Sequence, residues 1–131
     1  MSSGWDVLVV DDEPVVCDAI RLVLEHEGLR VAVARDGETA VRHPALEDCR
    51  VVFCDLMLPG QPGLEVLAHI RRRRPQLPIV AITRYPTAEN TDRSRAAGAT
   101  TFLAKPFDTT ELLELTRRVL SGTAAGEEEQ P

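Results

Sequence analysis

Short apolar runs alternate with longer amphipathic segments along the chain. The first four runs are rich in valine and isoleucine and too short for helices, which is typical of strands that are buried on both faces. A fifth, shorter run follows the same pattern. The predicted strands cover residues 7–10, 31–34, 51–54, 79–82 and 102–104.

A segment with helical spacing follows each run. Pro14 stands at a helix start, where its missing N–H costs nothing, and Gly28 ends that segment. Asp108 is a good N-cap, with Glu111 three residues later. Pro44 lies inside the second segment and should distort or shorten it. The helices are expected between residues 14 and 28, 38 and 46, 64 and 73, 88 and 97, and after Asp108.

Five strand–helix units in sequence predict an α/β fold with a parallel sheet that is covered on both faces. Right-handed crossovers favour a doubly wound (βα)5 arrangement, and five strands favour the flavodoxin-like order 2-1-3-4-5. Residues 1–120 are expected to form this domain. Residues 121–131 are expected to form a disordered acidic tail or the start of a linker.

Composition and charge narrow the class of protein. The 131 residues include 15 Lys and Arg against 21 Asp and Glu, a formal charge of −6, so direct nucleic-acid binding by this domain is not expected. The run Arg71–Arg74 is expected to end a helix rather than bind nucleic acid. No apolar stretch approaches the ~18 residues of a membrane span. Three cysteines without a CxxC pair fit a reducing compartment, so we expect a cytoplasmic protein without membrane contact.

Polar residues follow four of the predicted strands. Asp11 and Asp12 come after the first, Asp55 after the third, Thr83 after the fourth and Lys105 after the fifth. The carboxyl ends of parallel strands share one edge, and the order 2-1-3-4-5 makes the first and third strands neighbours at the switch point, where such folds bind ligands. These side chains are therefore expected to line one crevice.

The chemistry of this set points to phosphoryl transfer. Three clustered carboxylates raise one another's pKa unless a cation balances them, and an all-oxygen site selects Mg²⁺, with Mn²⁺ as a substitute. A lysine ammonium binds phosphate as a point charge, and Lys105 is the single lysine among fifteen basic residues. A threonine hydroxyl can donate to a phosphate oxygen, and a carboxylate can act as the nucleophile.

In its motifs the chain resembles a receiver domain of a two-component response regulator, over roughly residues 6–120. The matching segments are Val-Val-Asp-Asp-Glu-Pro at 9–14, Asp-Leu-Met-Leu-Pro-Gly at 55–60, Gly-Leu-Glu at 63–65, Thr83, and 98–108 with its Lys-Pro-Phe-Asp ending.

This resemblance implies a role for Asp55 as the acceptor of a phosphoryl group from a sensor histidine kinase or a histidine phosphotransfer protein. It implies Mg²⁺ ligands at Asp12, Asp55, the Met57 backbone oxygen and Asp11, the last directly or through water. Lys105 would pair with the phosphoryl group.

The resemblance also implies a conformational switch. Thr83 would move toward the phosphoryl group and Phe102 would rotate inward. The Lys105–Pro106 bond is expected to be cis, as an X–Pro bond permits.

Three other classes of function agree less well with these residues. A receiver domain is not an enzyme beyond its own Mg²⁺-dependent phosphoryl transfer and slow autodephosphorylation. A phosphorylation-independent (pseudo-receiver) interaction module is the alternative, and the intact set of acids, Thr83 and Lys105 argues against it. A phosphatase-like enzyme would need an acid at Met57. A flavodoxin-like cofactor carrier would place a phosphate against Asp11 and Asp12, which would repel it.

One residue departs from the family pattern. Arg84 follows the threonine, where a small residue is usual, and we hypothesise that it screens the phosphoryl group and lengthens the lifetime of the phosphorylated state. A downstream target or output domain would lie outside this chain. A phosphorylation-dependent dimer is a further possibility. Thr100 and Thr101 replace the acidic residues that one DNA-binding subfamily uses in the salt bridges of its dimer, so a dimer of that type is not favoured.

Overall fold

The computed structural model describes residues 2–122 and contains one parallel sheet in the order β2-β1-β3-β4-β5. This confirms the predicted doubly wound α/β fold. The strands are β1 (Val7–Val10), β2 (Val31–Ala34), β3 (Val51–Asp55), β4 (Ile79–Thr83) and β5 (Thr101–Ala104). The helices are α1 (Pro14–His26), α2 (Gly37–Arg42), α3 (Gly63–Arg73), α4 (Ala88–Ala97) and α5 (Thr109–Ser121), with a 3-10 turn η1 (Pro44–Glu47).

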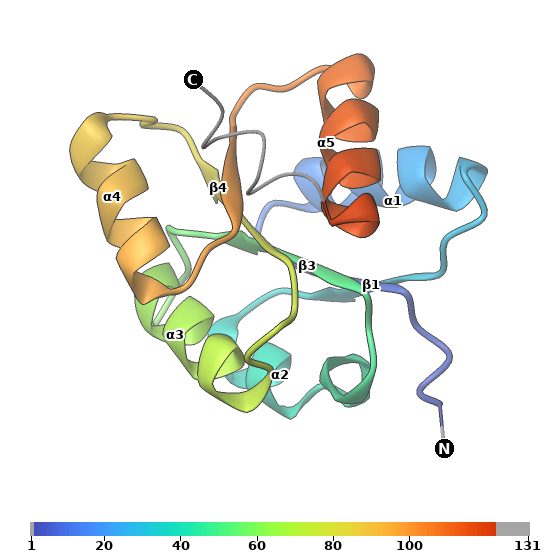
Figure 1. The fold of residues 1–131 in the computed structure, drawn as a ribbon, viewed down its shortest axis with the longest axis horizontal. Coiled ribbons are helices and arrows are strands. Elements are labelled where there is room, and N and C mark those ends of the chain that lie inside the picture. The colour runs from blue at the N-terminus through green and yellow to red at the C-terminus, as the bar shows by residue number, and fades with distance from the viewer. Residues whose placement is uncertain (1, 123–131) are drawn as a thin grey trace.

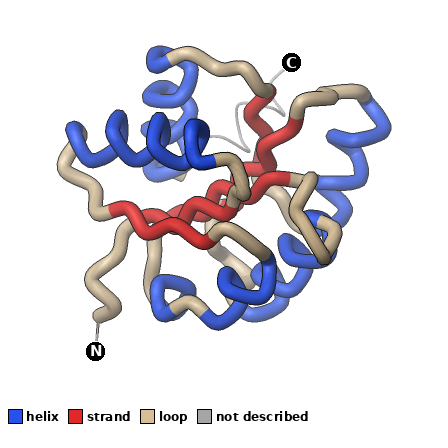
Figure 2. The backbone as a smooth tube through the Cα atoms, turned by 180° about the vertical axis from the view of Figure 1, so that it is seen from behind, coloured by secondary structure: helices blue, strands red, loops and turns tan. Residues whose placement is uncertain are grey.

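The helices cover both faces of the sheet. Helices α1 and α5 lie together on one face, and α2, α3 and α4 lie on the other, as Figure 1 shows and Figure 2 repeats from behind. Alternate strand residues therefore enter two separate cores. Phe53 of β3 packs with Ile20 of α1 and Leu112 of α5, whereas Val52 packs with Leu67 of α3.

Helix starts and ends follow the local chemistry of the sequence. The Asp108 side chain accepts a hydrogen bond from the Glu111 N–H in a complete capping box at α5. Helix α2 ends at Arg42 because His43 precedes Pro44 and adopts an extended backbone, so the expected interruption is confirmed. Helix α5 includes Ser121, and residues 123–131 of the predicted tail lie outside the described residues.

The arginine run at the end of α3 joins the elements of one face. Arg71 donates to the Gly98 carbonyl at 2.9 and 2.7 Å, and Arg74 donates to the Leu46 carbonyl at 2.9 Å. Arg73 donates to the Val41 carbonyl at 2.9 Å and pairs with Glu47. Helix α3 ends within this run, as predicted.

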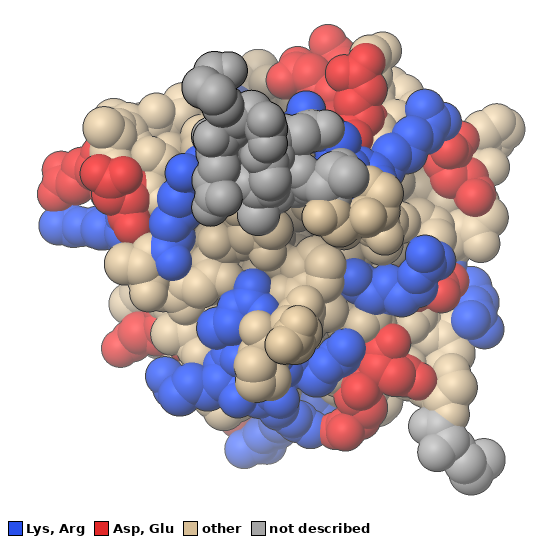
Figure 3. All heavy atoms as spheres, in the orientation of Figure 1, with Lys and Arg blue, Asp and Glu red and all other residues tan. Residues whose placement is uncertain are grey.

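Charge of both signs is spread over the surface. Figure 3 shows basic and acidic side chains interspersed on the face seen in Figure 1, with basic side chains gathered over the end of α3. Within residues 2–122, every helix is too short or too polar to cross a bilayer.

The start of α3 holds the backbone that follows Asp55. A Cβ atom at Gly63 would lie 2.2 Å from the Asp55 carbonyl oxygen and 2.5 Å from the Leu56 Cα atom. Gly63 also donates its N–H to the Leu56 carbonyl at 3.1 Å. Only a residue without a side chain fits this approach.

We predict that Gly63→Ala destabilises the fold by about 2 kcal/mol, because backbone atoms must move to accept the methyl group. Urea unfolding measures the loss. Gly60→Ala is the control, because its Cβ would meet open space and only its φ of +76° is unfavourable. We expect this control to lose about 1 kcal/mol of stability. Equal losses in the two variants would contradict the packing argument.

Candidate functional site

Five of the predicted site residues lie at one edge of the sheet. Asp55 and Thr83 are the last residues of β3 and β4, Asp11 and Asp12 follow β1, and Lys105 follows β5. The strand register aligns Asp55 with Ile82 and Thr83 with Ala104, so the carboxyl ends of the strands lie level.

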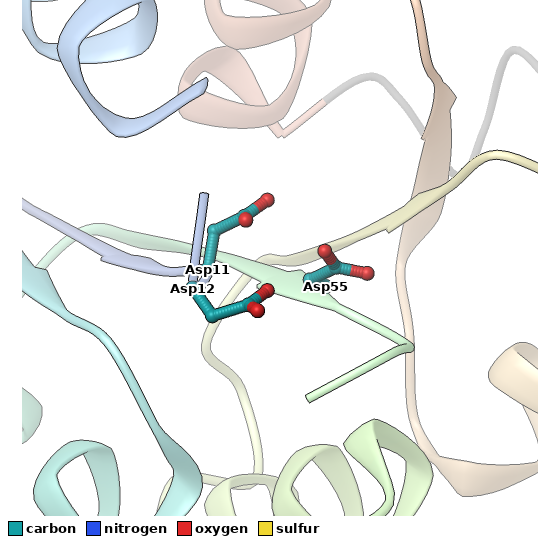
Figure 4. A group of neighbouring side chains, drawn as sticks. All are labelled: Asp11, Asp12 and Asp55. Carbon is teal, nitrogen blue, oxygen red and sulfur yellow. The ribbon is translucent and has the colours of Figure 1, made fainter. Parts of the chain in front are cut away.

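Three carboxylates form the centre of this edge. Figure 4 shows Asp11, Asp12 and Asp55 side by side, the first two just after β1 and Asp55 at the end of β3. One oxygen from each lies within 4.8 Å of the others. Asp11 is fully buried and Asp55 is 3% exposed, whereas Asp12 is exposed. The cluster is therefore enclosed on the protein side and open to solvent at Asp12.

The ammonium of Lys105 lies among carboxylates. Its Nζ donates to Asp55 Oδ2 at 2.7 Å and to Glu13 Oε1 at 2.7 Å, and lies 2.9 Å from Asp11 Oδ2. Its side chain is 5% exposed. Burial alone would lower the pKa of Lys105, but its hydrogen bonds to these carboxylates outweigh burial and raise the pKa. The ammonium stays charged at any physiological pH.

One buried oxygen of Asp11 has an ion-pair partner but no aligned hydrogen-bond donor among the described residues. Asp11 Oδ1 accepts from the Glu13 N–H at 2.8 Å. Within residues 2–122, Asp11 Oδ2 is the buried side-chain oxygen to which no donor is aligned, despite its closeness to Lys105. Burial raises the pKa of Asp11, and the charge of Asp55 adds to the effect. Three carboxylates that bring one oxygen each within 4.8 Å of one another form an all-oxygen set that fits a hard divalent cation such as Mg²⁺.

The loop after β3 is ordered around Asp55. Asp55 Oδ1 accepts from the Met57 N–H at 2.8 Å, and the Met57 side chain points outward with 63% of the residue exposed. The Asp55 oxygens thus contact a backbone amide on one side and the Lys105 ammonium on the other. The Met57 carbonyl remains a predicted ligand.

The two predicted switch residues lie on neighbouring strands. Thr83 is 2% exposed, and its Oγ1 accepts from the Tyr85 N–H at 2.9 Å. Phe102 is half-buried against the α3 side of the core, and the Arg95 guanidinium lies 5.7 Å from its ring centroid. The Lys105–Pro106 peptide bond is cis, as expected from the resemblance.

Glu13 is a site residue to which the sequence analysis gave no role. Its carboxylate accepts from Lys105 and, through the other oxygen, from Arg84 Nη2 at 2.5 Å. These two hydrogen bonds lower the pKa of Glu13. The available signal was the third acid of the Asp-Asp-Glu segment. Arg84 is half-exposed and pairs with Glu13 at the mouth of the site.

Comparisons with known proteins agree on one family. The sequence model of the response regulator receiver domain family matches residues 7–117 of this chain. The probable transcriptional regulatory protein TcrX of Mycobacterium tuberculosis is 35% identical over 117 residues, covering 89% of this chain and 50% of TcrX. The chain thus spans half of that relative's length.

Solved structures show the same fold. The crystal structure of the receiver domain of NtrX from Brucella abortus superposes with a TM-score of 0.82 at 33% identity, covering 88% of this chain and 98% of that one. The chemotaxis response regulator CheY4 of Vibrio cholerae gives a TM-score of 0.81 at 30% identity, covering 86% of this chain and 96% of CheY4.

We predict that Asp11→Asn raises the melting temperature in metal-free buffer at pH 8, because it removes a desolvated charge beside Asp55. Each kcal/mol corresponds to about 4 °C for a domain of this size. Asp11 has a raised pKa, so its folded form favours the proton. Wild type therefore regains stability relative to the variant as the pH falls toward the ordinary aspartate pKa of 3.8.

Thermal unfolding followed by circular dichroism measures both effects. Saturating Mg²⁺ should raise the melting temperature of wild type more than that of Asp11→Asn, since metal binding to the folded state is linked to stability. A variant that is less stable than wild type without metal, or that gains as much from Mg²⁺, would contradict this account.

Proposed function

From the premise that this chain belongs to the response regulator receiver domain family, we propose that it accepts a phosphoryl group on Asp55 in a two-component system. The supporting observation is the Lys105 ammonium, 2.7 Å from Asp55 Oδ2 in a cluster of carboxylates. Receiver domains are signalling modules rather than classical enzymes, and the proposed chemistry is the domain's own phosphorylation and slow autodephosphorylation.

In the proposed reaction, an Asp55 oxygen attacks the phosphorus of a phosphohistidine. The bond between phosphorus and the histidine nitrogen breaks, and the nitrogen keeps the electron pair. The Met57 N–H fixes the carboxylate of Asp55, and Lys105 balances charge on the transferred group. Mg²⁺, or Mn²⁺ in its place, held by Asp11, Asp12, Asp55 and the Met57 carbonyl, would supply positive charge to the phosphoryl oxygens.

A switch follows from the added charge. Phosphorylation adds about −2 charge at pH 7, which attracts the Thr83 hydroxyl proton. Movement of Thr83 leaves space on the α4 side of the sheet, where Phe102 packs. The proposed response is an inward rotation of Phe102, which changes the surface of α4, β5 and α5 and biases a two-state equilibrium.

The proposed donor is a sensor histidine kinase or a histidine phosphotransfer protein. TcrX is twice as long as the matched region, which supports an output domain or downstream target outside this chain. We propose no direct nucleic-acid or membrane contact for this domain, and we retain a cytoplasmic location and a phosphorylation-dependent dimer as predictions. The intact acids, Thr83 and Lys105 favour the phosphoacceptor over a pseudo-receiver.

We predict that Asp55→Asn abolishes labelling by acetyl phosphate in Mg²⁺, because an amide cannot form the acyl phosphate. Intact-protein mass spectrometry detects the added phosphoryl group. Asp18→Asn changes an exposed aspartate on α1 and is the matched control. Undiminished labelling of Asp55→Asn would identify another acceptor.

We predict that beryllofluoride with Mg²⁺ shifts the amide resonances of Thr83, Phe102 and α5 in wild type. In Thr83→Ala the amide resonances of residues next to position 83 should still shift. The shift at Phe102 should fall by at least half, because the hydroxyl that couples the site to the Phe102 ring is missing. A ¹H–¹⁵N titration measures both. Full-size Phe102 shifts in Thr83→Ala would exclude the proposed coupling.

A further inference from the structure

The Glu13 carboxylate joins two cations at the mouth of the site. Its Oε1 accepts from Lys105 at 2.7 Å and its Oε2 from Arg84 at 2.5 Å. The three residues come from the segments that follow β1, β5 and β4. One carboxylate therefore links three loops that the sheet holds side by side.

The partners of Lys105 differ in how readily they can leave. Asp11 is fully buried and its Oδ1 is held by the Glu13 N–H. Asp55 is 3% exposed and held by the Met57 N–H. The Glu13 side chain is 35% exposed, so water can replace its contacts without leaving a buried charge unpaired. A phosphoryl oxygen that approaches Lys105 would therefore displace Glu13.

Resting on the proposed function, we propose that Glu13 is a positioning residue that competes with the phosphoryl group for Lys105 and Arg84. On phosphorylation, Lys105 exchanges the Glu13 carboxylate for a phosphoryl oxygen. The new charge repels Glu13 and attracts Arg84, because a group of about −2 charge outweighs one carboxylate. Arg84, released from Glu13, then contacts the phosphoryl group.

The exchange sets the lifetime of the phosphorylated state. In hydrolysis a water oxygen attacks phosphorus, the bond between phosphorus and the Asp55 oxygen breaks, and Asp55 regains its carboxylate as inorganic phosphate leaves. A guanidinium over the phosphoryl group hinders the approach of water. Glu13 therefore shortens the lifetime and Arg84 lengthens it, and the effect of Glu13 acts largely through Arg84.

A double-mutant cycle tests this coupling. Wild type, Glu13→Gln, Arg84→Ala and the double variant are labelled with acetyl phosphate in saturating Mg²⁺, and decay is followed after the donor is removed. We expect the half-life of Glu13→Gln to be about threefold longer and that of Arg84→Ala about threefold shorter, the size of a partly exposed ion pair. In the Arg84→Ala background, Glu13→Gln should lengthen the half-life by a clearly smaller factor.

Two further variants separate charge from structure. Glu13→Asp keeps the negative charge and should keep a half-life close to that of wild type, and the effect of Glu13→Gln should shrink at 1 M salt, where charges are screened. The exposed pair Glu38 and Arg42 on α2 supplies the matched controls Glu38→Gln and Arg42→Ala, which should leave the half-life unchanged.

Each outcome decides between the proposals. A Glu13→Gln half-life equal to or shorter than that of wild type overturns the competition. Equal factors in the two backgrounds overturn the role of Arg84. If wild type is labelled normally and all variants lose the label at the wild-type rate, this inference is rejected, and the proposal that Asp55 is the phosphoacceptor stands. Wild type that takes no label on Asp55 rejects both.

Discussion

The contact of one ammonium with the buried carboxylates is the interaction on which the site depends. Asp11 and Asp55 are removed from water, and carboxylates buried without a partner would oppose folding. Lys105 supplies the partner, although β5 is separated from β3 by β4 in the sheet. A long, unbranched side chain that starts at the end of β5 can pass the end of β4 and reach both carboxylates at 2.7 and 2.9 Å. The strand order thus determines both where the ammonium must lie and how long the side chain that carries it must be.

The charges at this edge do not cancel within the chain. Asp11, Asp12, Asp55 and Glu13 carry four negative charges, and Lys105 and Arg84 carry two positive ones. The formal excess of two matches one divalent cation. Asp12, the exposed member of the carboxylate cluster, is the point at which an ion can enter from solvent. The charge excess and the all-oxygen set of carboxylates therefore agree on a hard divalent cation.

The sequence predicted the parts of the fold that depend on periodicity and local chemistry. Alternating strands and helices indicated the sheet order, and Pro44 indicated the broken helix. Contacts that end on backbone carbonyls could not be predicted. Arg71 and Arg74 donate to carbonyls of distant elements, and every residue type carries a carbonyl. Glu13 was missed for a related reason. It lies one residue beyond the recognised aspartates, and only the fold brings Arg84 and Lys105 to its two oxygens.

The geometry around Nζ also explains why the chain, which uses arginine at fourteen of its fifteen basic positions, has lysine at 105. The carboxylates of Asp11, Glu13 and Asp55 each place one oxygen within 2.9 Å of the Lys105 Nζ atom. An ammonium distributes its three protons around a single nitrogen, whereas a guanidinium places its five donors in a plane. No nitrogen of a guanidinium carries three protons, so an arginine at this position could not donate to all three carboxylates from one atom. The solvent-exposed position of Arg84 has no such limit, and there the chain uses arginine.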